Sequence, residues 1–75
     1  MNYKQEIITS SIAARENEIA LYDIDLHNFA YSLEAIEGDE SMLSFAEELR
    51  ERDRQTRYEK RKSELILAAL KAQQE

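Results

Sequence analysis

The chain has 75 residues, of which 43% are hydrophobic and 35% charged, and its net charge at pH 7 is −6. A chain of this length forms one small domain, residues 1–75, whose core is marginal without a disulfide, a metal or a partner. Because there is no cysteine, disulfides and thiolate metal sites are excluded, and the acidic balance argues against nucleic-acid binding by the whole surface.

The sequence carries no sign of export or of membrane insertion. Its longest apolar run, Leu65–Leu70, has six residues, whereas a membrane span needs about 20. The N-terminal residues are polar, and the apolar segment of a secretory signal does not follow them. We therefore expect a cytoplasmic protein that does not contact a membrane.

A 3–4 apolar repeat organises the first part of the chain and predicts a helix over about 3–36. The repeat lasts four heptads with Arg15 as its only charge, which is typical of a helix that packs along its length against another helix. Residues 22–26 alternate like a strand, but they lie inside the longer helical repeat and no turn signal flanks them. The apolar positions of the repeat are Ile8, Ile12, Ile19, Tyr22, Leu26, Phe29, Leu33 and Ile36.

The opposite side of this predicted helix is also apolar, at Ile7, Ala14, Leu21, Ile24, Tyr31 and Ala35. A helix that is apolar on two sides is buried on two sides, and a second helix of the same chain covers only one of them. The spare side predicts a further layer of protein, which we expect to be a second copy in a four-helix bundle, or else a different protein. The predicted interface residues are Ile7, Leu21, Ile24 and Tyr31 of this helix, together with Leu65 and Leu67 of the apolar run Leu65–Leu70.

One glycine and no proline punctuate the chain, so a single turn is predicted at residues 37–41. Gly38 fits the left-handed backbone position just past the end of a helix, which glycine adopts without steric cost. Asp39 or Ser41 is the predicted N-cap of a second helix over about 42–72. The middle of that helix, Arg50–Lys62, is nearly all charged, which is typical of a solvated helix surface.

Folding the chain at Gly38 pairs the two helices as a hairpin when the numbers of paired residues total 78. Apolar residues then meet at both ends, and mixed layers lie between them, with Arg15 opposite Ser63 and within reach of Glu59. We therefore predict an all-α fold, an antiparallel two-helix hairpin that resembles a coiled coil and dimerises into a four-helix bundle. The second helix contributes Met42, Phe45, Leu49, Ile66 and Leu70 to the seam.

The strongest local charge pattern is a row of arginines on one side of the second helix, at Arg50, Arg54, Arg57 and Arg61. Their spacing of +4, +3 and +4 suits a guanidinium row that follows phosphates, so a nucleic-acid-binding regulator is one hypothesis. Glu51, Asp53 and Glu59 dilute the positive charge, however, and favour a solvated helix side crossed by ion pairs.

No residue pattern indicates catalysis or a bound cofactor. His27 is the only histidine, and Asp23 lies one turn before it, but two ligands are too few for a metal site unless a symmetric dimer doubles them. The carboxylates at Asp23, Asp25 and residues 37–40 need a cleft before they can act as acid and base, and a narrow hairpin offers none. We therefore predict a protein that is not an enzyme and that holds no metal or other cofactor.

The segment Ala20–Ala30, with the sequence ALYDIDLHNFA, resembles small acidic helical accessory proteins from the early regions of lambdoid bacteriophages. This resemblance implies a non-enzymatic protein in the host cytoplasm that adjusts host takeover or the choice between lysis and lysogeny by binding other macromolecules. The residues themselves favour an interaction or regulatory protein that presents helix faces to a protein partner. A further alternative is an acidic decoy of a host DNA-binding protein, because residues 1–41 carry a net charge of −7.

Overall fold

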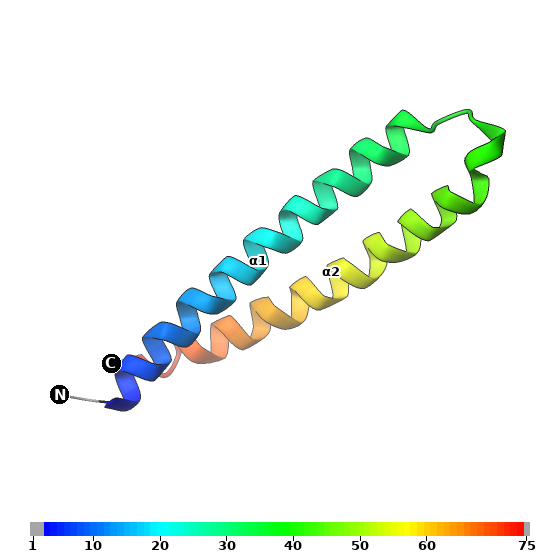
Figure 1. The fold of residues 1–75 in the computed structure, drawn as a ribbon. Helices are drawn as coiled ribbons and strands as arrows, with labels where there is room; N and C mark the ends of the chain where they lie inside the picture. Colours follow the sequence, from blue (N-terminus) through cyan, green and yellow to red (C-terminus); the bar gives the residue numbers. More distant parts are fainter. Residues whose placement is uncertain (1–2, 75) are drawn as a thin grey trace.

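Two long antiparallel helices make up the protein, and the computed structural model describes residues 3–74. Helix α1 spans Tyr3–Ala35, a short 3-10 helix η1 spans Glu40–Met42, and helix α2 spans Leu43–Lys71. Figure 1 shows the turn at one end of the molecule and both termini at the other. The predicted all-α hairpin is confirmed, and the described residues contain no strand.

The turn between the helices depends on Gly38 and Asp39. Gly38 has φ +82°, the left-handed conformation expected of it. The Asp39 carboxylate then accepts hydrogen bonds from the backbone N–H and the hydroxyl of Ser41, at 3.0 and 2.6 Å. These bonds hold the pKa of Asp39 below its usual range. Asp39 is therefore the N-cap of η1, and α2 begins only after this short helix.

The side of α1 that carries the apolar repeat faces α2. Ile8 and Ile12 are buried, and the repeat from Ile19 to Ile36 is half-buried. Eight of the ten buried and half-buried residues of α2 also follow a 3–4 spacing, at Ala46, Leu49, Asp53, Thr56, Lys60, Ser63, Leu67 and Leu70; the other two are Glu59 and Glu64. The contact between the helices is therefore apolar near its two ends and polar in its middle.

The contact side of α2 differs in part from the predicted one. Met42, Phe45 and Ile66 were expected in the seam but are 38%, 38% and 40% exposed, whereas Ala46 is buried and Leu67 is half-buried. Leu49 and Leu70, by contrast, lie in the contact side as predicted, buried and half-buried respectively. Only the alternate positions move by one residue, from 45 to 46 and from 66 to 67, so the contact side of α2 is turned by less than the roughly 100° that separates neighbouring residues.

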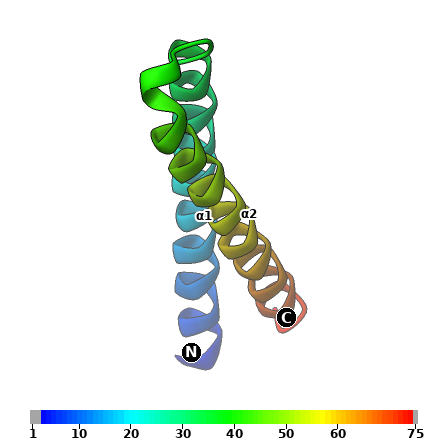
Figure 2. The same ribbon diagram turned by 90° about the vertical axis from the view of Figure 1, so that its right-hand side faces the viewer.

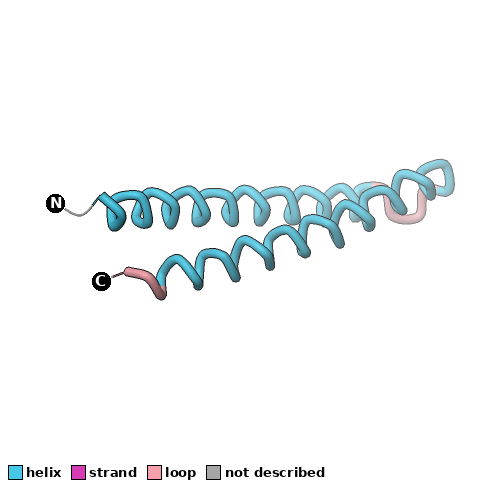
Figure 3. The backbone as a smooth tube through the Cα atoms, turned by 90° about the horizontal axis from the view of Figure 1, so that it is seen from below, coloured by secondary structure: helices cyan, strands magenta, loops and turns pink. Residues whose placement is uncertain are grey.

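The register in which α2 pairs with α1 also differs from the predicted one. The Ser63 hydroxyl donates to the Glu18 carboxylate, three residues further along α1 than its predicted neighbour Arg15. The two helix axes also cross at an angle: Figures 2 and 3 show the helices diverging toward the end that carries the termini. At that end the Gln5 side-chain amide still reaches the backbone carbonyl of Gln73, at 3.3 Å.

Candidate protein interface

The middle of the hairpin is held by hydrogen bonds that converge on Glu18. Its carboxylate accepts from the Tyr22 hydroxyl at 2.8 Å, from the Ser63 hydroxyl at 3.1 Å and from the Arg15 guanidinium at 3.0 Å. Tyr22, then Ser63 and Arg15, hold the pKa of Glu18 below its usual range, and the same carboxylate raises the pKa of Tyr22. Arg15, expected near Glu59, is therefore paired within its own helix.

A second polar contact crosses between the helices one turn further on. The Lys60 ammonium lies 2.6 Å from the Asp23 carboxylate, and this hydrogen bond raises the pKa of Lys60. Asp23, considered above as a metal ligand beside His27, is thus part of the contact between the helices. Among the described residues no buried side-chain nitrogen or oxygen lacks a partner. The polar middle is a satisfied structural layer.

The outer side of α1, turned away from α2, is an uninterrupted uncharged surface. Ten positions at 4–3 spacing run the length of the helix, all are exposed, and none carries a charge at neutral pH. We call this surface the outer stripe; it consists of Tyr3, Ile7, Ser10, Ala14, Asn17, Leu21, Ile24, Asn28, Tyr31 and Ala35. Its large apolar members are widely exposed: Leu21 at 54%, Ile24 at 56% and Tyr31 at 70%.

The outer stripe extends the apolar side found from the sequence. Apolarity alone picks out six of its positions, and it misses Tyr3, Ser10, Asn17 and Asn28, three of which are polar. The regular 4–3 spacing is the signal that joins them to the rest, because residues so spaced share one side of a helix. The stripe lies about 150° around the α1 axis from the side that faces α2.

The apolar residues of α2 do not form a comparable surface. Leu65, also predicted at the interface, is 54% exposed, but Leu67 lies in the contact side of α2. Leu43 and Tyr58 are 66% and 61% exposed at separate places along the helix. Large exposed apolar residues thus gather mainly near the two ends of α2, whereas on α1 they recur along the whole of an uncharged side.

The arginine row lies on the surface of α2, and its members have acidic neighbours. Arg54 pairs with Glu51, the Arg57 guanidinium lies 2.7 Å from the Asp53 carboxylate, and Arg61 lies 4.0 Å from Glu64. Asp53 raises the pKa of Arg57. These carboxylates compete with phosphate for the guanidinium donors, so the row is a weaker anion-binding surface than its spacing alone indicates.

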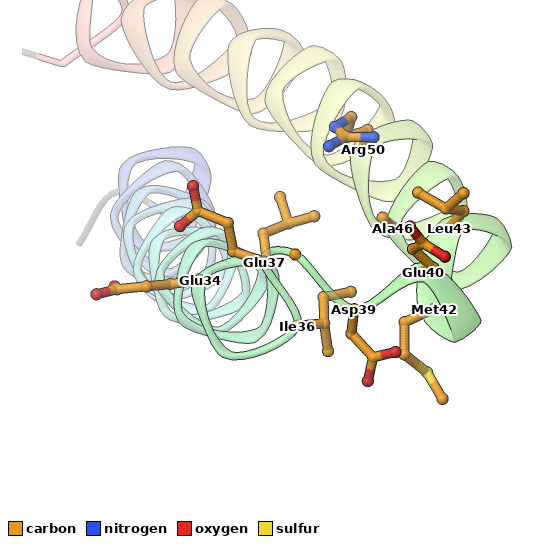
Figure 4. A pocket seen from close by; sticks show the side chains of 11 residues that line it. Glu34, Ile36, Glu37, Asp39, Glu40, Met42, Leu43, Ala46 and Arg50 are labelled. Atoms are coloured by element: carbon orange, nitrogen blue, oxygen red, sulfur yellow. The ribbon is translucent and has the colours of Figure 1, made fainter.

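A hollow lies beside the turn, between the end of α1 and the start of α2 (Figure 4). Its apolar part includes Ile36, Leu43 and Ala46, while Glu37 comes from the turn and Arg50 from α2. The acidic residues of the turn leave this end of the molecule negatively charged.

His27 is exposed on α1. Within residues 3–74 no three histidine, cysteine, aspartate or glutamate side chains gather as a metal site. No helix in the same range has the length and apolarity needed to cross a bilayer. Comparisons with family models, with curated proteins and with solved structures give no match to this chain. Inference of its function therefore depends on its own surfaces.

Proposed function

We propose that this protein is a non-enzymatic interaction protein and that the outer stripe of α1 is its protein-binding surface. The observation that carries the proposal is the exposure of Leu21 and Ile24 in the middle of a charge-free side that runs the whole length of α1. Exposed apolar surface of this continuity is typical of a protein interface. A regulatory role of the kind implied by the bacteriophage resemblance would act through this surface.

The size of the exposed surface supports the proposal. The chain exposes 5793 Å². A compact folded chain of 8.8 kDa exposes about 4,800 Å². The excess is on the order of 1,000 Å², close to the roughly 800 Å² that each partner buries in a standard protein interface.

The small core of the hairpin points the same way. Only four hydrophobic residues between 3 and 74 are buried: Ile8, Ile12, Ala46 and Leu49. Domains below about 80 residues need additional stabilisation beyond a single core, and this chain has no cysteine to form a disulfide. Burial of the outer stripe against another polypeptide supplies a second apolar contact.

The proposal is tested by placing a charge within the outer stripe. Leu21→Glu or Ile24→Glu should abolish assembly, because burying an unpaired carboxylate in an apolar contact is costly. Ala30→Glu is the matched control, since Ala30 is exposed on α1 but lies away from the stripe. For each variant, light scattering gives the mass, a tagged chain reports captured proteins, and circular dichroism reports helix content. Unchanged mass and unchanged capture in the Leu21 and Ile24 variants would contradict the proposal.

The alternative function is nucleic-acid binding by the arginine row, since Arg50, Arg54, Arg57 and Arg61 are all exposed. It requires binding of a DNA or RNA probe that weakens steeply with salt and disappears when the four arginines are replaced by glutamine. We rank it second because Arg54, Arg57 and Arg61 already have acidic neighbours on their own helix.

A further inference from the structure

We infer that the polypeptide bound by the outer stripe is the α1 helix of a second copy, running antiparallel with Leu21 opposite Ile24 of that copy. This inference rests on the proposed function, because it names the partner of the same surface. Four features support it: the symmetry of the stripe, the match of its side chains, the charges at the two ends of the hairpin, and the position of the stripe relative to α2.

The spacing of the stripe is the same when the helix is read in either direction. Its steps alternate between four and three residues from Tyr3 to Ala35 and are symmetric about the centre. A reversed copy of α1 therefore meets the stripe with stripe residues wherever the two helices overlap, which in the proposed register is residues 10–35 and leaves Tyr3 and Ile7 outside the overlap. A symmetric contact in which one surface binds itself is the commonest arrangement in homodimers.

Side-chain size and polarity select one antiparallel register. With Leu21 opposite Ile24, the Asn17 amide faces Asn28 of the second copy, and the Tyr31 ring faces Ala14. The two amides satisfy each other, as buried polar groups require, and each large ring meets a small residue.

The other arrangements that keep stripe on stripe match less well. Shifting the antiparallel register by one heptad sets the Asn17 amide against Leu21, which leaves a polar group facing an apolar one. A parallel dimer sets Tyr31 against Tyr31 and Ala14 against Ala14, so large side chains meet large ones and small meet small.

The charges at the ends of the hairpin favour the antiparallel direction as well. The turn end carries Glu34, Glu37 and Asp39 within a few residues. A parallel dimer places two such ends side by side, where like charges repel. The antiparallel dimer places the two turn ends at opposite ends of the assembly, which avoids this repulsion.

The position of the stripe determines the shape of the dimer. Because the stripe lies about 150° from the side that faces α2, the two α1 helices form the centre and the two α2 helices lie outside them. The product is a layer of four helices rather than the compact four-helix bundle expected from the sequence.

Single cysteines test the register directly, because the chain has none of its own. Ala14→Cys and Tyr31→Cys proteins are mixed, allowed to exchange, and treated with a short bis-maleimide. We expect a covalent dimer on a denaturing gel from the mixture, and none from either protein alone, because two copies of residue 14 lie about 25 Å apart along the axis. The matched control is Ala14→Cys mixed with Ala30→Cys, which moves the second thiol one residue along α1 and off the stripe.

Each other outcome overturns the inference in an identifiable way. A covalent dimer from Ala14→Cys alone would show a parallel pair, and one from Ala14→Cys mixed with Ile24→Cys would show the other antiparallel register. If no pair cross-links and the wild-type mass is that of one chain, the stripe does not bind a second copy. If Leu21→Glu then still abolishes capture of another protein, the proposed function stands although the inference about a second copy fails. If capture is unchanged, both the inference and the proposed function fail.

Discussion

Leu49 offers the clearest test of how the hairpin is held together. Its side chain is 4% exposed in the apolar contact near the turn. Replacing a buried leucine by alanine removes apolar contact and leaves a cavity, which together cost about 2–5 kcal/mol. A chain of this length has a total free energy of unfolding of about 4–11 kcal/mol. Leu49→Ala should therefore remove a large part of the stability of the hairpin.

The assay is urea unfolding followed by circular dichroism, at one chain concentration for all proteins because the proposed self-association would also contribute to stability. Leu43→Ala is the matched control: it makes the same chemical change on the same helix, but Leu43 is 66% exposed. We expect the control to change the free energy of unfolding by less than about 0.5 kcal/mol. Equal losses for the two variants would refute the assignment of Leu49 to the contact side of α2.

Two further predictions concern the turn and the polar middle. Gly38→Ala should lower the free energy of unfolding by about 1–2 kcal/mol, and Gly38→Asn by less, because Gly38 has a left-handed backbone conformation. Nothing lies within 4 Å of an added Cβ, so the cost comes from the backbone conformation and not from a clash. Equal stability of all three chains in urea would contradict this. Glu18 has a lowered pKa in the folded state, so its contribution to stability is present above its unfolded pKa of about 4.3 and is lost as the pH falls through the folded value. Glu18→Gln should therefore lose less stability than the wild type on acidification, and parallel pH profiles of the two proteins would rule out this role.

The contact side of α1 is readable from the sequence because its apolar repeat is continuous. The contact side of α2 is harder to identify from the sequence, because the apolar repeat stops in the charged middle of that helix. Near the turn, the predicted seam residue Leu49 is compatible with either Phe45 or Ala46 as its neighbour in the contact, and sequence spacing does not choose between the two. In the structure Ala46 is buried beside Leu49, while Met42 and Phe45 are each 38% exposed.

The polar middle shows a second limit of sequence pattern. Lys60 appears in the sequence as one charge among many in a solvated segment, but it lies across from Asp23 and pairs with it. Ser63 is 2% exposed and donates to Glu18; the predicted pairing placed it in the contact opposite Arg15, but nothing in the sequence indicates Glu18 as its acceptor. Shifting the helices past each other would leave the Ser63 hydroxyl buried without an acceptor, so this pair helps to fix the register.

The exposed side of α1 is readable for a different reason. An uncharged second side is visible in the sequence of α1 alone, whether or not another protein covers it. Spacing and apolarity are therefore enough to identify Leu21, Ile24 and Tyr31. Apolar spacing does not indicate which polypeptide covers them. The antiparallel pairing rests on the positions of Asn17 and Asn28, which apolarity does not detect.

The central claim is that the outer stripe of α1 is a protein interface, and the mass of the chain in solution tests it most directly. Light scattering across a range of concentrations should give twice the chain mass of 8.8 kDa for the wild type, and 8.8 kDa for Leu21→Glu with its helix content unchanged. A mass of 8.8 kDa for both proteins, together with the same captured proteins, would contradict the account.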